Sequence, residues 1–443
     1  MGKFLKSLLV IAIFSFLVIL FNKYYFKDYN IEVVDKNMEC KLEYKGLKDA
    51  VDFTLDDNGN YYVVFKNKIQ YIDSHGKSYI LFADNNMDIN SIEYYKNKLY
   101  FTSLSSVYSY DLYNRECKAI IDDLPNFGDY NKSLIKVNGG YLYITIGAAT
   151  NSGIVGKDNE WIKNNPYNHD ISPYKIVLNG INFENGKTGA FVNYGSKTIQ
   201  GQIIPGHFPG NASIIMYNLD NGVSGTYAWG IRNVKGMDFD SRGRIIASVG
   251  GMEDRGLRPV KGDTDYLYVI KQKSWYGWPD YSGGDPLNSP RFKGRNNKNI
   301  SFILDNHPTT NPGAPVYVHK KLDSLKGVAV DKIGALGEID GIYFYDDVDK
   351  KICYLNDKGV LKEKIKFNTY SKISSIKYVK NQIIILDSSK GNLFKLGLLN
   401  KGNIITNNKP VIYFLIISIL ITIISLLIML VKMRHDNRNS NLN

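Results

Sequence analysis

The chain has 443 residues and a formal net charge of +12, but its lysines are spread through turns and chain ends without an aromatic-interleaved basic stripe, which argues against a nucleic-acid partner. Its 3 cysteines are widely separated, so the sequence holds neither a disulfide framework nor a C-x-x-C metal motif. With 33 tyrosines, 20 phenylalanines and few Ala- or Leu-rich stretches, the composition favours an all-β protein.

The first 27 residues contain an apolar run, residues 8–21, with lysines on both sides. This pattern is typical of an export signal. Neither a small-x-small cleavage site nor a nearby cysteine for lipid attachment follows the run. Residues 1–27 are therefore predicted to be an uncleaved signal anchor, with cleavage as the alternative.

Between residues 28 and 400 one pattern recurs six times: a short alternating strand, a polar turn, and a second strand rich in Tyr, Ile and Val. Several copies recur at about 40 residues, the length of a four-stranded propeller blade, and residues 68–72, 107–110 and 393–396 are predicted third strands. We therefore expect a six-bladed β-propeller. The hairpins begin near Val51, Ile92, Leu134, Gly236, Gly327 and Ile376.

Two spacings between hairpins are much longer than the others and contain insertions, residues 151–226 and 250–311. Both insertions are rich in Gly, Asn, Pro and aromatic residues. Such segments are expected to form ordered loops on one end of a propeller, where function is commonly found.

The C-terminal part of the chain predicts a membrane helix. Residues 401–410 read as a polar linker, and residues 411–431 are uncharged and long enough to cross a hydrocarbon layer of about 30 Å. A basic tail, residues 432–443, follows. Because positive charge flanks both apolar segments at the chain ends, both termini are expected in the cytoplasm, with the propeller outside the cell membrane.

The middle of the chain resembles the glucose/sorbosone dehydrogenase family of six-bladed propellers. The residues that carry the resemblance begin with LYITIGAATNSGIVG from Leu142, continue with GAFV from Gly189 and the long segment 227–280, and end with DNHP from Asp305. They cover roughly the middle half of the chain. The resemblance implies oxidation of a sugar or alcohol that depends on pyrroloquinoline quinone (PQQ) and Ca²⁺.

The resemblance also implies site residues. It places Arg232 and Asn233 on the quinone, and an arginine fork suits a carboxylate. It places the backbone carbonyls of Gly250 and Gly251 on calcium, which accepts such oxygens. The nearby carboxylates of Glu253, Asp254 and Asp265 could complete that shell or could simply be solvated.

The chain departs from the family at the catalytic base. Family enzymes carry a histidine shortly before the strand that corresponds to residues 142–147, whereas this chain has Asp129 at that place and no histidine between His75 and His169. An aspartate is a weaker proton acceptor than imidazole unless its surroundings raise its pKa.

Two functions therefore stay open. The first is a membrane-anchored quinone-dependent sugar or alcohol dehydrogenase with Asp129 as the candidate base. The second is a propeller that has lost the redox step and binds a glycan, a wall polymer or a protein partner.

Overall fold

The computed structural model describes residues 14, 31–399, 425, 431 and 432. Residues Glu32–Gly397 form one compact unit built from strands. The predicted signal anchor and the predicted membrane helix lie almost entirely outside the described residues. Within the described part of the chain, no helix is both long enough and apolar enough to cross a membrane.

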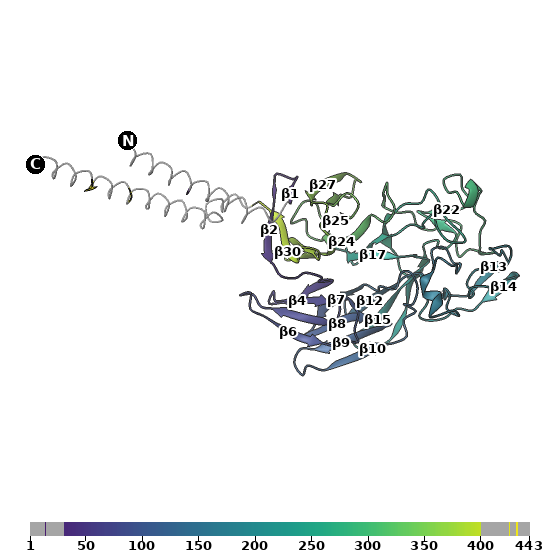
Figure 1. Cartoon of the computed structure of the whole chain (residues 1–443), viewed down its shortest axis with the longest axis horizontal. Coiled ribbons are helices and arrows are strands. Elements are labelled where there is room, and N and C mark those ends of the chain that lie inside the picture. Colours follow the sequence, from purple (N-terminus) through teal and green to yellow (C-terminus); the bar gives the residue numbers. More distant parts are fainter. Residues whose placement is uncertain (1–13, 15–30, 400–424, 426–430, 433–443) are drawn as a thin grey trace, which may run out of the picture. The chain divides into compact units, whose positions relative to one another are not determined.

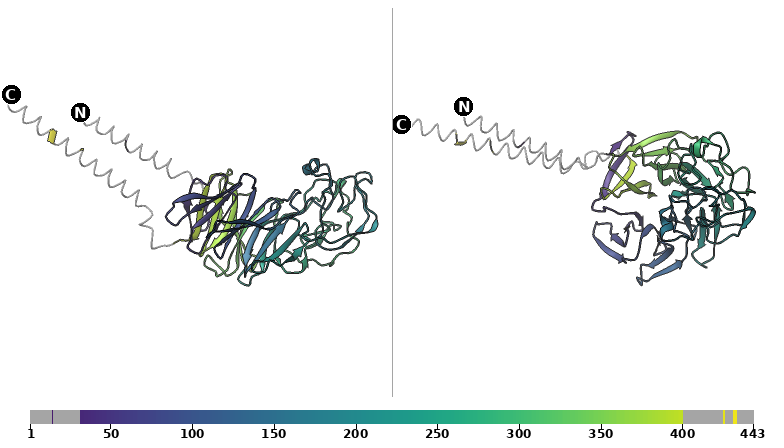
Figure 2. Two further views of the ribbon diagram at one scale, coloured as in Figure 1. Left: turned by 90° about the horizontal axis from the view of Figure 1, so that it is seen from below. Right: turned by 45° about the vertical axis from the view of Figure 1, so that its right-hand side comes forward.

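The compact unit is a six-bladed β-propeller, as the sequence predicts. Among the described residues, six sheets of four or five strands follow one another along the chain (Figure 1) and lie around a central axis (Figure 2). In order of the blades, the strands are β3 (Asp52–Leu55), β4 (Tyr61–Phe65), β5 (Lys68–Ile72) and β6 (Ser78–Ala83); β7 (Ile89–Tyr95), β8 (Lys98–Ser103), β9 (Ser106–Asp111) and β10 (Cys117–Ile121); β11 (Ile135–Asn138), β12 (Tyr141–Ile146), β15 (Ser213–Asn218), β16 (Ser224–Trp229) and β20 (Ser274–Trp275); β17 (Val234–Phe239), β18 (Ile245–Val249), β19 (Tyr266–Ile270) and β23 (Tyr317–Val318); β24 (Leu325–Asp331), β25 (Gly341–Asp346), β26 (Lys351–Leu355), β27 (Leu361–Lys366) and β1 (Glu32–Val33); β28 (Ile373–Val379), β29 (Gln382–Asp387), β30 (Asn392–Leu398) and β2 (Met38–Tyr44).

The predicted hairpins form the first two strands of each blade, and the predicted third strands are β5, β9 and β30. The first strands of neighbouring blades contact one another, which places them around the axis. Gly59, in the turn between β3 and β4, has φ +87°, and Gly243, between β17 and β18, has φ +73°. This left-handed conformation suits glycine in these two turns, whereas asparagine adopts it in the turns between β7 and β8 (Asn97, φ +61°) and between β28 and β29 (Asn381, φ +67°).

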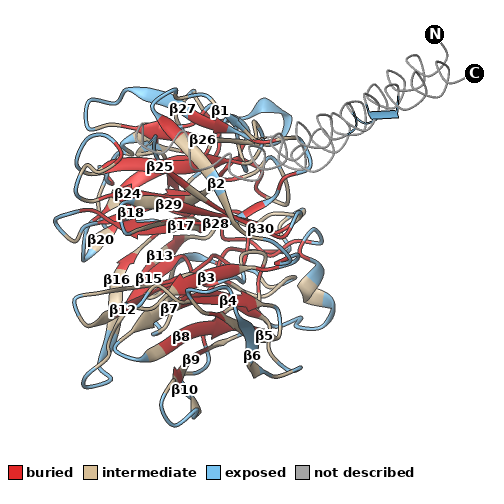
Figure 3. Ribbon diagram, turned by 90° about the vertical axis from the view of Figure 1, so that its left-hand side faces the viewer, coloured by how far each residue is buried: buried red, intermediate tan, exposed pale blue. Residues whose placement is uncertain are grey.

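Inner strands are buried on both faces because every blade lies between two others. In β4, Val63 and Val64 are both 0% exposed although their side chains point to opposite faces. Val63 packs with β29 residues of the sixth blade, and Val64 packs with Ile92 and Phe101 of the second. Burial of each such side chain stabilises the fold by about 1.5–3 kcal/mol. Figure 3 shows buried residues concentrated in the strands and exposed ones in the connecting loops.

The ring closes through strands from the two ends of the propeller sequence. Strand β2 joins the sheet of β28–β30, next to β30. An ion pair between Lys395 Nζ and Glu43 Oε1, 2.7 Å apart, also joins these two strands. The three cysteines are unpaired thiols, so closure depends on strand pairing and not on a disulfide.

The two insertions fold together into a shared apolar core. They hold the short hairpins β13–β14 (Ile176–Asn179 and Gln200–Ile204) and β21–β22 (Tyr281–Ser282 and Asp285–Pro286), with 3-10 turns η1 (Glu160–Lys163) and η2 (Arg295–Asn297). Phe191 from the first insertion and Trp278 from the second meet in this core, their ring centroids 5.7 Å apart. This joint core gives the loops between them fixed positions.

Candidate functional site

The candidate site lies at the end of the propeller that carries the insertions, here named the insertion end. Arg232 and Asn233 directly precede β17, and Gly250 and Gly251 directly follow β18. Because β17 and β18 are antiparallel, with Val234 opposite Val249, these two segments lie side by side. The amide of Gly250 donates to the carbonyl oxygen of Asn233 over 2.9 Å. The structure thus brings together the four residues predicted for cofactor and metal.

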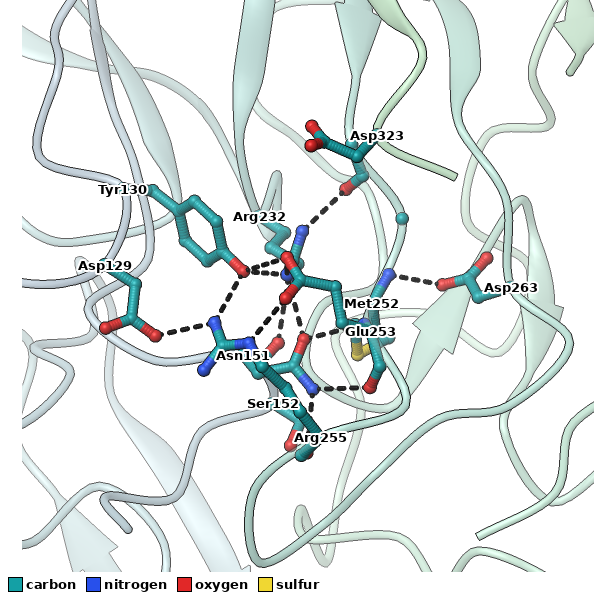
Figure 4. Close-up of polar contacts among 12 residues, drawn as sticks. Asp129, Tyr130, Asn151, Ser152, Arg232, Met252, Glu253, Arg255, Asp263 and Asp323 are labelled. Atoms are coloured by element: carbon teal, nitrogen blue, oxygen red, sulfur yellow. Dashed lines mark hydrogen bonds and ion pairs between the residues drawn. The ribbon is translucent and has the colours of Figure 1, made fainter. Parts of the chain in front are cut away.

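Arg232 is 4% exposed, and protein groups occupy every nitrogen of its guanidinium. Its Nε donates to the carbonyl oxygen of Asn151 over 3.1 Å, and its Nη1 donates to that of Gly250 over 3.4 Å. Its Nη2 donates to the side-chain oxygen of Asn151 and to Glu253 Oε1, each over 2.8 Å. The ring of Tyr130 covers the guanidinium, 4.1 Å from Cζ to the centroid, and the Tyr130 hydroxyl accepts a further hydrogen bond (Figure 4).

A second arginine, Arg255, extends these contacts. Its Nε donates to Glu253 Oε2 over 2.5 Å, so Glu253 bridges two guanidinium groups. Its two terminal nitrogens form ion pairs of 2.7 Å with Asp158 and Asp129. We refer to the resulting set as the arginine network: Asp129, Tyr130, Asn151, Asp158, Arg232, Glu253 and Arg255.

The network fixes the charge state of Glu253. Burial raises the pKa of this carboxyl, but the charge of Arg232 and the hydrogen bonds from Arg255, Arg232 and Tyr130 outweigh burial and lower the pKa to about 2. Glu253 is therefore ionised at neutral pH. It was predicted as a possible metal ligand, and the structure instead places both of its oxygens on arginines.

Asp129, the candidate base, accepts three hydrogen bonds through its carboxylate. Trp161 Nε1 donates to Oδ1 over 2.9 Å, while Asn159 Nδ2 and Arg255 Nη2 donate to Oδ2 over 2.8 and 2.7 Å. The side chain is 15% exposed. A substrate hydroxyl would compete with these donors for the carboxylate oxygens, so the base role stays a prediction that the geometry does not favour.

The residues around Gly250 and Gly251 do not fit a calcium ion. The carbonyl oxygen of Gly250 accepts a hydrogen bond from Arg232, so a cation bound there would face a guanidinium. Asp265 instead accepts the backbone amides of Gly251, Asp323, Ser324 and Leu325, at 2.7–3.2 Å. Asp254 is exposed. Among the described residues, no group of three His, Cys, Asp or Glu side chains could hold a metal ion.

Close packing explains why position 251 is a glycine. A Cβ built there would lie 2.1 Å from the carbonyl oxygen of Thr264. Real Cβ atoms essentially never approach that closely, so the backbone contact requires glycine.

A cavity of about 350 Å³, here named the mouth cavity, opens beside the network. Arg232, Asn233 and Glu253 line it from the fourth blade, Tyr130 from the third and Asp323 from the segment before the fifth. Asn233 is half-buried and lines this space, as does Arg232, whose guanidinium is held by its protein partners. Lys235, also in the lining, pairs with Asp323 over 2.6 Å.

A buried carboxyl supports the segment that holds the network. Asp170, 1% exposed, accepts the amide of Ala149 over 2.6 Å and the hydroxyl of Thr150 over 2.5 Å. The carbonyl oxygen of Ala149 in turn accepts the amide of Asp129. Burial raises the pKa of Asp170, and despite the opposing hydrogen bonds it reaches about 7.

Sequence reasoning missed Tyr130, Asn151, Asp158 and Arg255. Asn151 lies inside the GAATNSG stretch that carries part of the family resemblance, so its position held a signal. Arg255 follows Glu253 by two residues, and only the course of the loop shows that both side chains turn toward Arg232.

Solved structures of two sugar dehydrogenases and of a carbohydrate-active enzyme share this fold. The holo form of the PQQ domain of pyranose dehydrogenase from Coprinopsis cinerea aligns with 84% of this chain and 97% of its own, at 12% identity and a TM-score of 0.55. A calcium structure of a carbohydrate-active enzyme from Trichoderma reesei aligns with 84% and 98%, at 14% identity and a TM-score of 0.57. The PQQ-bound form of aldose sugar dehydrogenase from Streptomyces coelicolor aligns with 82% and 99%, at 14% identity and a TM-score of 0.51.

No family model matches the sequence, and no curated protein matches it. At identities of 12–14%, the structural likeness confirms the fold that the resemblance predicts. The site must be judged from its own residues.

Proposed function

We propose that this chain is a ligand-binding propeller with the fold of the sugar dehydrogenases, in which the arginine network fills the place where the resemblance puts a quinone. The closed set of contacts around Arg232 carries the proposal. To hold the carboxylates of a quinone, Arg232 would have to exchange Glu253 and Asn151 for the ligand and leave an ionised Glu253 without one of its two cations. The ligand classes that fit this reading are a glycan, a wall polymer or a protein partner.

The test mixes the full-length protein with PQQ and calcium and follows quinone absorbance and the reduction of an electron-accepting dye across a panel of sugars and alcohols. We expect neither calcium-dependent quinone binding nor dye reduction. The matched variant is Glu253→Gln, which removes the carboxylate from Arg232. Quinone binding gained only in this variant would support the proposal, whereas dye reduction by the unaltered protein would overturn it.

The second candidate is the activity that the resemblance implies, PQQ- and calcium-dependent oxidation of a sugar or alcohol. It would place Arg232 and Asn233 on the quinone, the carbonyls of Gly250 and Gly251 on calcium, and Asp129 as base. The observation in its favour is Asn233, which lines the mouth cavity of a propeller with the dehydrogenase fold. If this candidate holds, dye reduction occurs and Asp129→Asn abolishes it.

We further propose that the propeller is displayed outside the cell membrane, anchored by residues 1–27 and 411–431, with both termini in the cytoplasm. The apolar, uncharged sequence of residues 411–431 and the basic flanks of both segments support this arrangement. Reporter fusions after Lys401 and after Asn443 should report the outside and the inside of the cell, respectively. The reverse result would exclude the proposed arrangement with both termini in the cytoplasm.

A further inference from the structure

A second and larger space, the axial cavity, lies where the six blades meet and measures about 580 Å³. Residues of the first strand of every blade line it, which places it on the propeller axis. It shares Lys132, Leu134 and Lys235 with the mouth cavity, so the two spaces adjoin at the insertion end. Its volume is within the usual range for small-molecule sites.

Deep in the axial cavity the charges are balanced. Lys377, 7% exposed, pairs with Glu93 over 2.8 Å and with Asp52 over 3.3 Å, and Lys136 pairs with the same Glu93 over 3.2 Å. Two ammonium groups thus face two carboxylates. These four side chains satisfy one another and need no ligand.

The rim differs, because positive charge there exceeds negative charge. Lys48, Lys132 and Lys372 lie just before β3, β11 and β28, and all three line the cavity with exposed side chains. Within the described part of the chain, none of them forms an ion pair. Asp49 is the acidic residue of this rim, so the rim carries three lysines and one carboxylate. An anion entering the cavity would meet this unbalanced charge first.

Hydroxyl groups line the same space. Ser375 and Ser91 donate to Asp52 over 2.7 and 3.2 Å, and Ser374 donates to the carbonyl oxygen of Ala50 over 3.1 Å. A serine hydroxyl has one proton and two lone pairs, so Ser374 and Ser375 keep the capacity to accept, whereas Ser91 Oγ already accepts the amide of Ile135 over 3.2 Å. The lining therefore offers cations at its rim and hydrogen-bond acceptors further in. A ligand that fits carries both negative charge and donating hydroxyl groups.

We propose that the axial cavity binds a sugar or polyol that carries a phosphate or carboxylate group. The charged group sits among Lys48, Lys132 and Lys372, and the hydroxyl groups of the ligand donate to the serine oxygens below. This inference rests on the proposed binding function and names its ligand class. The same chemistry occurs in a free sugar phosphate and at the end of an anionic surface polymer, and the experiment separates these two sources.

The test titrates the full-length protein with glucose 6-phosphate, glucose, inorganic phosphate and poly(glycerol phosphate), and measures binding by calorimetry. We expect glucose 6-phosphate or the polymer to bind more tightly than glucose and inorganic phosphate. The one that binds more tightly identifies the source. Binding should weaken between about 50 mM and about 500 mM salt, because salt screens exposed charges. Equal affinity for inorganic phosphate would overturn the carbohydrate part, and equal affinity for glucose would overturn the anionic part.

Lysine variants connect binding to the rim. Lys132→Gln and Lys372→Gln should each weaken binding about fivefold, the effect of removing one exposed charge partner. Lys132→Arg and Lys372→Arg keep the charge and should retain most of the affinity. The matched control is Lys358→Gln, an exposed lysine in the turn between β26 and β27, at the opposite end of the blade. Binding that is unchanged in both rim variants would overturn the proposed site.

The two proposals fail in different assays. Dye reduction with PQQ and a sugar would overturn the proposed non-redox function. It would not affect the calorimetric measurement of ligand binding at the axial cavity. Absence of binding by every anionic probe would overturn the axial site and leave the dye assay unaffected. Lys132→Gln and Lys372→Gln alter exposed side chains, so both variants are expected to fold. Thermal unfolding of each variant, compared with that of the unaltered protein, is the control for folding.

Discussion

Arg232 Nη2 lies 2.8 Å from Glu253 Oε1, and this contact joins the start of the fourth blade to the loop that leaves its second strand. Glu253 holds Arg255 through its other oxygen, and Arg255 reaches Asp129 before the third blade. Four charged side chains therefore connect two blades across the mouth of the propeller. Their first role is to hold these loops together.

Replacement of Glu253 by glutamine should destabilise the protein by about 1–2 kcal/mol, because two guanidinium groups lose their shared counter-charge. The value is below that for a fully buried pair because the side chain is 33% exposed. Urea denaturation measures it. The neighbouring Asp254→Asn alters an exposed side chain and should change the free energy of unfolding by less than about 0.5 kcal/mol. Equal effects of the two variants would contradict the structural role of Glu253.

The same carboxyl predicts a loss of stability in acid. The pKa of Glu253 in the folded protein is about 2, below the ordinary value of about 4.3. Its contribution is complete above about pH 4.3 and is lost as the pH falls through about 2. The difference in unfolding free energy between the unaltered protein and Glu253→Gln should therefore shrink on acidification. A difference that stays constant down to about pH 2 would contradict the lowered pKa.

Asp170 predicts the opposite trend. Its pKa in the folded protein is about 7, above the ordinary value, so its contribution is complete below about pH 4 and is lost as the pH rises through about 7. Asp170→Asn cannot ionise, so the advantage of the unaltered protein over this variant should fall between about pH 5 and about pH 8. Asp220→Asn, at an exposed aspartate, should show no such change. Urea denaturation at about pH 5 and about pH 8 measures the difference in unfolding free energy between the unaltered protein and Asp170→Asn. A difference that grows with pH would contradict the raised pKa.

Gly251→Ala should destabilise the protein by about 1–3 kcal/mol, since its Cβ would meet the carbonyl oxygen of Thr264. Gly225→Ala is the matched control, because a Cβ at that glycine meets nothing within 4 Å. Thermal unfolding of the two variants gives the comparison. A neutral Gly251→Ala would mean that the loop shifts easily, and with it the position assigned to Glu253.

The blades could be predicted because the two strands and the turn of each hairpin are adjacent in the sequence. In the turns that contain Gly59 and Gly243, a left-handed glycine separates two short apolar strands, and neither feature depends on distant sequence. Strand β2 could not be placed this way, because its partner β30 lies at the far end of the propeller sequence. Hydropathy patterns predict strands and do not predict which distant strand completes a sheet.

The site was predicted in part for the same reason. Arg232, Asn233, Gly250 and Gly251 adjoin a predicted hairpin, so their proximity followed from strand pairing. The donors to Asp129 did not, since Asn159, Trp161 and Arg255 come from insertions without periodicity. Arg255 lies 126 positions from Asp129 in the sequence. Contacts of this range require the folded path of both insertions.

The pairing of β2 with β30 sets an order of events during synthesis. A strand made among the first residues of the propeller has its sheet partner among the last, so the sixth blade cannot form until translation has passed β30. Until then β2 and the open face of the first blade remain uncovered, and apolar residues such as Phe53 and Val63 have no neighbour from the sixth blade. The nascent chain is therefore most exposed to misassociation just before its final strand is added.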